Sequence, residues 1–153
     1  SHTTLQNQQT YSTGNGSGPL PVITTDFNAD NILDMTVTNY NTNNIGNGTF
    51  RSPTLYPTNG TNPHWITLAD FNNDNRNDLA VTSEDNNSIN IFINNGNETF
   101  QLEQTYDSGG WLPSSITAAD FNNDSITDLA TTILVLILWV FYLASAMAHF
   151  NLQ

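Results

Sequence analysis

The sequence predicts an all-β fold made of repeated units, and three observations lead to this prediction. An aspartate-rich block occurs three times, the apolar runs around it are short and rich in β-branched residues, and Asn, Gly and Pro separate these runs. The first 130 residues have no helical periodicity. A chain of 153 residues is long enough for one domain with a hydrophobic core.

The three copies are aligned by their first aspartates, Asp26, Asp70 and Asp120, which are 44 and then 50 residues apart. Each copy has a proline seven residues before this aspartate, an apolar residue four before it and a phenylalanine directly after it. A second landmark, Gly-Asn-x-Thr-Phe, ends at Phe50 and again at Phe100. Self-similarity with such a period is typical of stacked repeat folds.

The second copy indicates which strands a full unit contains. We expect strands over 66–69, 79–82 and 88–93, and an outer strand after the second landmark. The first copy has no counterpart of 88–93, so we expect it to lack one strand. A unit of about 50 residues with about four strands has the size of one propeller blade. The sequence therefore predicts an incomplete β-propeller of about three blades over residues 1–132.

The charge balance narrows the classes of partner. The formal net charge is -12, with Arg51 and Arg76 as the cations against fourteen acids, so we expect neither nucleic acid nor an anionic membrane surface as a partner. Acids packed closely in three blocks repel one another unless a cation lies among them. Cysteine is absent and the three histidines share no ligand spacing, so thiolate sites are ruled out and zinc is not expected.

Each block reads Asp-x-Asn-x-Asp-x-x-x-Asp, which places side-chain oxygens at positions one, three, five and nine. Such a loop can wrap a hard cation that takes six to eight oxygens, and calcium fits better than magnesium, which demands a tight octahedron. Position seven would add its backbone carbonyl. Position twelve is not Glu and the flanks are strands, which excludes an EF-hand. The expected ligands are Asp26, Asn28, Asp30, Ile32 and Asp34 in loop one (26–34), Asp70, Asn72, Asp74, Arg76 and Asp78 in loop two (70–78), and Asp120, Asn122, Asp124, Ile126 and Asp128 in loop three (120–128).

The alternative interpretation of these blocks is a set of turns without metal, because Asp and Asn favour turns on their own. Three copies at matching offsets favour calcium over this alternative. Loop two is the best supported of the three, because it lies in the only copy whose strands are all expected.

The repeated block resembles the FG-GAP or VCBS repeats of integrin alpha-subunit propellers and many extracellular proteins, over roughly residues 1–132. The resemblance implies that the loop joins the first two strands of a blade and binds calcium. It also implies an extracellular or cell-surface protein with a role in adhesion or ligand recognition. The usual glycine at position six is replaced by Asn31, Asn75 and Ser125. Asn tolerates left-handed backbone angles, so we expect loops one and two to keep this turn better than loop three.

From residue 133 to residue 150 the third copy departs from the template and becomes an uncharged, almost wholly apolar segment. An uncharged run over 129–148 is about 20 residues, which at 1.5 Å per residue matches a membrane core of roughly 30 Å. We therefore expect a hydrophobic segment over 133–150 with a transmembrane helix as its leading interpretation. We also expect residues 129–132 to form the strand after loop three, and the residues that remain would be too few for a helix that crosses a membrane comfortably. An aberrant chain end and a buried strand pair are the alternatives.

The sequence contains no Ser-His-Asp order, nucleophile elbow or phosphate-binding glycine loop, so we do not expect an enzyme. The predicted function is that of a calcium-binding propeller segment with a protein or carbohydrate ligand. A longer chain or an oligomer would supply the remaining blades, and the apolar segment would anchor the protein if it spans a membrane. The alternatives are an accessory repeat region of a carbohydrate-active enzyme and a degenerate membrane-anchored gene fragment.

Overall fold

The computed structural model of the chain describes residues 18–40, 44–48, 54–58, 62–97, 99–109, 112–133 and 138–142, and all regular elements among them are β-strands. Sheet one contains β1 (Gly18–Thr25), β2 (Asp34–Tyr40), β3 (Asn44–Gly48) and β4 (Thr54–Pro57). Sheet two contains β5 (Pro63–Ala69), β6 (Asp78–Ser83), β7 (Ser88–Asn94) and β8 (Phe100–Asp107). Sheet three contains β9 (Pro113–Ala119), β10 (Asp128–Ile133) and β11 (Leu138–Tyr142).

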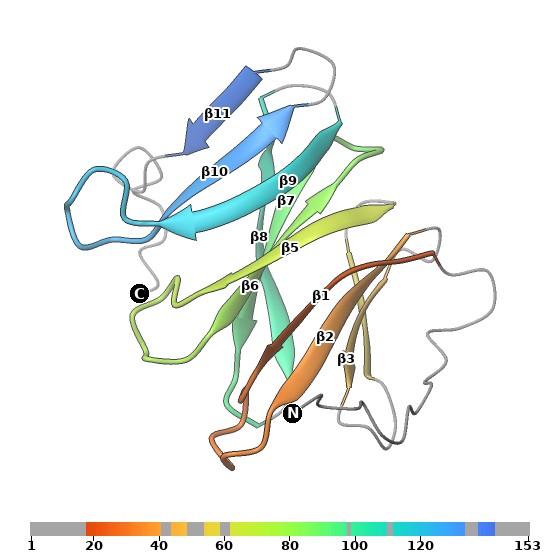
Figure 1. Cartoon of the computed structure of the whole chain (residues 1–153), viewed down its shortest axis with the longest axis vertical. Helices are drawn as coiled ribbons and strands as arrows, with labels where there is room; N and C mark the ends of the chain where they lie inside the picture. The colour runs from red at the N-terminus through yellow and green to blue at the C-terminus, as the bar shows by residue number, and fades with distance from the viewer. Residues whose placement is uncertain are drawn as a thin grey trace, which may run out of the picture.

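Within each sheet the strands follow chain order and pair antiparallel with their neighbours. Sheets one to three succeed one another across the molecule, and β1, β5 and β9 lie along its middle (Figure 1). Strand β5 contacts both β1 and β9. Neighbouring blades of a propeller have this arrangement, with the first strand of each blade innermost.

The repeated proline at the start of each sheet is followed by an irregularity in strand pairing. The register shifts between Pro63 and Ile66 in sheet two, and a shift also occurs at the corresponding position of sheets one and three. Proline cannot donate a hydrogen bond to a ladder, so it is tolerated at a strand end or at a bulge. In sheet two the hydroxyl of Thr82 accepts a hydrogen bond from the Trp65 N–H at 2.9 Å within this bulge.

Two hydrophobic cores hold the sheets together, and each lies between two of them. The first joins sheets one and two and contains Phe27, Tyr56, Ile66, Leu79, Val81, Phe92 and Phe100. The second joins sheets two and three and contains Phe71, Ala80, Ile89, Ile91, Ile116 and Leu129. Sheet two is therefore buried on both faces, which explains why every residue of β6 is buried.

The apolar residue four positions before each first aspartate packs toward the preceding sheet. Ile66 is 2% exposed in the first core and Ile116 is 3% exposed in the second. Val22, at the same position of sheet one, is 53% exposed because no described sheet precedes it. Burial of this position therefore depends on the neighbouring sheet.

The repeated phenylalanine packs in the opposite direction, toward the following sheet. Phe27 is 2% exposed and its ring meets Phe100 of sheet two edge to face, with 5.0 Å between ring centroids. Phe71 is 5% exposed in the second core. Phe121 is 44% exposed, because within the described residues no sheet follows sheet three. Loops one and two are thus anchored in the core that their sheet shares with the next one.

The first copy has four strands, so the expectation that it lacks one is wrong. Strand β3 takes residues 44–48, which correspond in part to the second landmark, and β4 is shortened to Thr54–Pro57. Both edges of β3 are paired, with β2 and with β4. Strand pairing is made by backbone groups, so a segment rich in Asn and Gly can complete the sheet even though it lacks the apolar pattern of a strand.

The expected helix over 133–150 is also wrong where the structure describes this segment. Ile133 ends β10, and Leu138–Tyr142 form β11, which pairs antiparallel with β10 from Leu129 to Ile133. The rest of the segment lies outside the described residues. Among the residues described, none belongs to a helix with the length and apolar character that a membrane span requires.

Candidate metal centre

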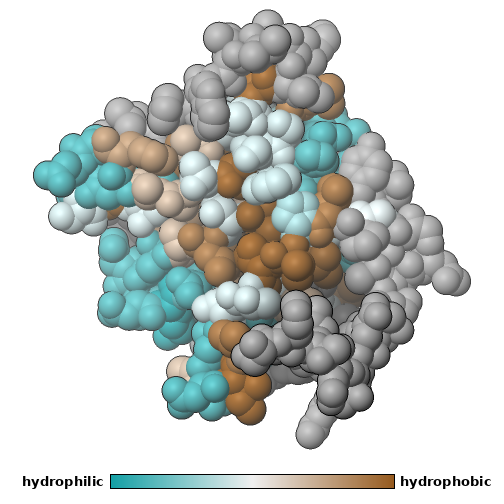
Figure 2. Space-filling model, in the orientation of Figure 1, coloured by the Kyte–Doolittle hydropathy of each residue, from teal (hydrophilic) through white to brown (hydrophobic). Residues whose placement is uncertain are grey.

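The three aspartate loops lie on one edge of the molecule because each joins the first and second strands of its sheet. In Figure 1 they project at the left and lower side, after β1, β5 and β9. Hydrophilic residues follow the same edge in the space-filling view (Figure 2). The structure therefore places the residues predicted as ligands along this edge and repeats the geometry of the loop three times.

The carboxylate at position one organises the turn of each loop. In loop one, Asp26 Oδ1 accepts a hydrogen bond from the N–H of Asp30 at 3.2 Å, and Oδ2 accepts one from Asn31 at 2.7 Å. The corresponding distances are 3.0 and 2.7 Å in loop two and 3.2 and 2.8 Å in loop three. All three loops curl in the same way around their first aspartate.

Positions three and five are tied to each other. In loop two the amide of Asn72 donates to Asp74 Oδ2 at 2.9 Å, and Asn72 Oδ1 accepts from the N–H of Asp74 at 3.1 Å. Asp74 Oδ1 accepts in turn from the N–H of Arg76 at 2.9 Å. Loops one and three contain the same three hydrogen bonds. The same short-range hydrogen bonds therefore connect positions three, five and seven in all three loops.

The aspartate at position nine closes the loop and begins the next strand. Its Oδ2 accepts a hydrogen bond from the N–H of the repeated phenylalanine, at 2.9 Å for Asp34, 2.9 Å for Asp78 and 3.0 Å for Asp128. All three side chains are buried. This position is thus a structural clasp as well as a predicted ligand, a role that the recurrence of Phe and Asp seven residues apart could have indicated.

Two residues in each loop adopt left-handed backbone angles. At position four φ is 62° for Ala29, Asn73 and Asn123, and at position six it is 64° for Asn31 and Asn75. Ser125, at position six of loop three, has φ of 67°. Loop three therefore makes the same turn as loops one and two, although serine is less suited to it than Asn.

The donor set fits a hard cation chemically. Each loop supplies three carboxylates and one amide oxygen, and an ionised carboxylate has about four lone-pair sites, of which the hydrogen bonds above use only some. The alternative interpretation, turns without metal, also agrees with this geometry, because the hydrogen bonds from these side chains to the backbone two residues on are those of Asx turns. Among the described residues, no group of three or more His, Cys, Asp or Glu side chains is arranged so that it could hold a metal ion.

Two loop aspartates, Asp78 and Asp120, have pKa values that are shifted in opposite directions. Burial raises the pKa of Asp78 to about 6, and repulsion from Asp74 and Asp70 adds to the increase. The backbone hydrogen bonds from Asn94 and Phe71 lower this pKa and offset part of the increase. Desolvation favours a higher pKa at Asp120 as well, but hydrogen bonds from the loop backbone, that of Ser125 foremost, lower its pKa overall. Burial therefore dominates at Asp78, whereas the backbone hydrogen bonds dominate at Asp120.

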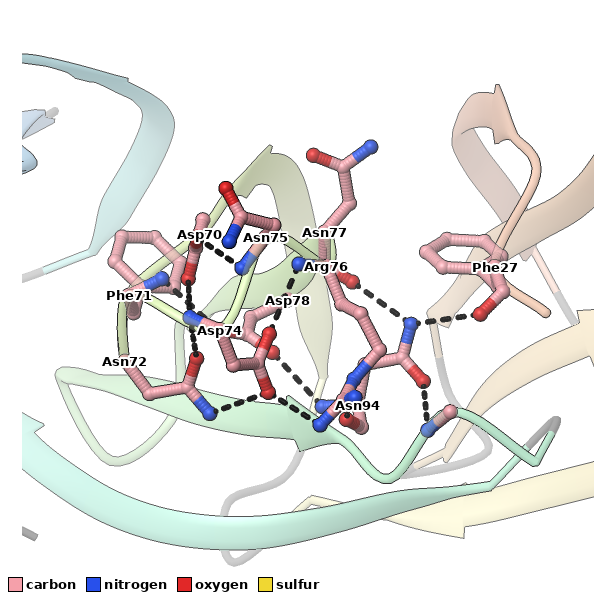
Figure 3. Close-up of polar contacts among 11 residues, drawn as sticks. Phe27, Asp70, Phe71, Asn72, Asp74, Asn75, Arg76, Asn77, Asp78 and Asn94 are labelled. Atoms are coloured by element: carbon pink, nitrogen blue, oxygen red, sulfur yellow. Dashed lines mark hydrogen bonds and ion pairs between the residues drawn. The ribbon is translucent and has the colours of Figure 1, made fainter. Parts of the chain in front are cut away.

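Loop two is also connected to sheet one, as Figure 3 shows. The buried Asn94, at the end of β7, donates from its backbone N–H to Asp78 Oδ1 at 2.8 Å and from its side chain to the carbonyl of Phe27 at 2.9 Å. The side chain of Asn77 donates to the hydroxyl of Thr25 at 2.9 Å. These contacts join the end of loop two to the beginning of loop one.

The sequence matches the model of the FG-GAP-like repeat family twice, over residues 26–81 and 70–131. Together these matches cover more than half of the chain. The chain belongs to the FG-GAP-like repeat family. Each match begins at the first aspartate of a loop and extends through the loop of the next copy. No curated protein matches the chain.

Two contacts of the FG-GAP-like repeats were not expected from the sequence. Asn94 lies two residues before the second landmark, as Asn44 does in the first copy, but this recurrence does not indicate its partners. The threonines twelve residues after each first aspartate do recur, and the hydroxyls of Thr82 and Thr132 accept from the bulged backbone N–H groups of Trp65 and Ser115. This recurrence could have identified their role.

Proposed function

We propose that the chain is a non-enzymatic, calcium-binding β-propeller segment of an extracellular or cell-surface protein that acts in adhesion or ligand recognition. The observation that carries this proposal is the threefold repetition of one loop geometry, with the same oxygen donors at positions one, three, five and nine. Each loop keeps the same three carboxylates and one amide, which is a donor set that suits calcium. The adhesive role and its protein or carbohydrate ligand rest on the resemblance to integrin-like propellers.

Calcium would relieve the electrostatic cost of the loops. The formal net charge of the chain is -12, and the acids of one loop lie within hydrogen-bonding reach of the same few backbone groups. Coulomb repulsion between such charges is largest at low ionic strength. A divalent cation in each loop would neutralise most of this repulsion and stabilise the strands that follow.

Isothermal calorimetry on the full chain tests the proposal. We expect calcium-dependent heat with dissociation constants of about 10⁻⁴ to 10⁻³ M, the range of extracellular calcium modules. Asp74→Ala should remove the heat of one loop. Glu103→Ala, which removes an exposed acid on β8, is the matched control and should bind as the unchanged protein does. Absence of calcium-dependent heat at several millimolar would refute the metal assignment.

The proposal includes further blades, supplied by a longer chain or by a second copy. Val22 and Phe121 are exposed, whereas their counterparts in the other sheets are buried between sheets. Sheet one of one molecule and sheet three of a second molecule therefore present the two halves of a contact between blades. Such head-to-tail contacts use two different surfaces of the same chain.

Self-association through these surfaces is the expected result for the isolated chain. Sedimentation velocity should give a weight-average coefficient that rises with protein concentration, and Phe121→Asp should reduce this rise. Gln104→Asp, at an exposed position of β8, should not. A monomer at all concentrations would contradict the expected contact.

A further inference from the structure

Loop two contains a cation of its own. Arg76 occupies position seven, and its guanidinium turns back into the loop, where Nη2 lies 2.5 Å from Asp74 Oδ2 (Figure 3). The same oxygen accepts the amide hydrogen bond of Asn72. Asp74 is one of the predicted metal ligands, so the arginine engages an oxygen that a bound cation would use.

The path of the arginine side chain is defined by two further contacts. Its Nε donates to the carbonyl of Asn94 at 3.1 Å. Its stem lies against Gly96, where an added Cβ would be only 3.2 Å from Arg76 Cδ, and where φ of 77° also favours glycine. The turn between β7 and β8 thus leaves room for the arginine and holds it over loop two.

The other two loops have no such cation. Position seven is Ile32 in loop one and Ile126 in loop three, and both side chains are exposed, at 66% and 41%. The three loops otherwise share their acids and their hydrogen bonds. Loop two therefore has one positive charge more than loops one and three, set beside the same donor set.

We propose that Arg76 is an internal counter-ion that engages loop two when no metal is bound and lowers its calcium affinity below that of loops one and three. This inference rests on the proposed calcium-binding function. A calcium ion must displace the guanidinium from Asp74 and is then repelled by it at short range. The pair is partly exposed, with side-chain exposures of 45% for Arg76 and 22% for Asp74. Exposed ion pairs are easily broken, so binding is weakened and not abolished.

The order in which the loops fill can be measured residue by residue. Backbone amides at position six, those of Asn31, Asn75 and Ser125, donate to the first aspartate of their loops and report on each loop separately. A calcium titration of the full, ¹⁵N-labelled chain should give a midpoint for Asn75 about tenfold higher than for the other two, which corresponds to about 1.4 kcal/mol.

Two substitutions isolate the charge. Arg76→Ile, which gives loop two the residue of loops one and three, should lower the Asn75 midpoint about tenfold and leave the midpoints of Asn31 and Ser125 unchanged. Arg76→Lys keeps the charge and should leave the Asn75 midpoint close to that of the unchanged protein. Amide spectra without calcium establish that both variants fold, which is expected because the side chain is partly exposed.

Two results would overturn the inference while calcium binding stands. In one, the Asn75 midpoint stays the same in Arg76→Ile although all three loops titrate. In the other, Arg76→Lys behaves as Arg76→Ile does. If none of the three amides responds to millimolar calcium, the proposed function itself fails.

Discussion

Replacing Phe27 by alanine is expected to lower the free energy of unfolding by about 3–5 kcal/mol, the usual cost of removing a buried aromatic side chain. Phe27 belongs to loop one, yet it is 2% exposed within the core between sheets one and two. Its ring contacts Phe100 edge to face, an arrangement that adds to the free energy of burial. Urea unfolding followed by tryptophan fluorescence measures the change.

Phe121→Ala is the matched control, because it removes the same residue from the same position of the repeat. Phe121 is 44% exposed, so we expect this substitution to cost less than about 1 kcal/mol, as most surface changes do. Equal losses for the two variants would show that the phenylalanine acts within its own loop and not through the neighbouring sheet.

Asp78→Ala is expected to destabilise the protein by about 2–5 kcal/mol even when calcium is absent. The carboxylate is fully buried and accepts hydrogen bonds from the N–H groups of Phe71 and Asn94, at 2.9 and 2.8 Å. Its removal leaves two donors without this partner, and a buried donor without a partner costs about 1–3 kcal/mol. Urea unfolding in the presence of a chelator measures this structural contribution separately from metal binding.

Asp74→Ala separates the two roles of the loop acids. Asp74 is partly exposed, and its partners within loop two can bind water in its absence. In the presence of chelator we expect it to cost less than about 1 kcal/mol. With saturating calcium both variants should lose the stabilisation that the ion gives to loop two. A large loss for Asp74→Ala in chelator would contradict this division.

The loops could be predicted from the sequence because their geometry is local. The hydrogen bonds that form each loop join residues at most seven apart, and the repetition of Asp and Asn at fixed offsets records that geometry directly. The all-β character followed from short β-branched runs in the same way. The FG-GAP-like resemblance is confirmed by two matches of the family model.

The two wrong predictions about the fold, a missing strand in the first copy and a helix after residue 133, concern segments that form strands through backbone pairing. Strand β3 has the sequence NIGNG, which carries no strand pattern, but it lies between β2 and β4 and pairs with both. The apolar segment after residue 133 satisfied the length rule for a membrane helix, but residues 138–142 pair with the free edge of β10. Hydropathy alone does not distinguish these outcomes, since both a helix and a strand satisfy backbone groups.

Long-range contacts were beyond the reach of sequence patterns for a different reason. The side chain of Asn94 donates a hydrogen bond to the carbonyl of Phe27, 67 residues earlier. The Nε of Arg76 in loop two donates to the carbonyl of Asn94 at the end of β7. A repeat alignment shows which residues recur, but it does not show which residues of a neighbouring sheet they contact. Charge was the only signal at Arg76, because position seven is apolar in the other two copies.

The anchoring of loops one and two in the following sheet has a mechanical consequence. A force that separates sheets one and two must extract the Phe27 ring and open loop one in the same event, so the smallest unit able to yield spans two sheets. The first family match, over residues 26–81, likewise begins in loop one and ends in sheet two. In a protein under tension, this arrangement would distribute the force over successive sheets. A cation that stiffens one loop would also raise the force needed to separate its sheet from the next one.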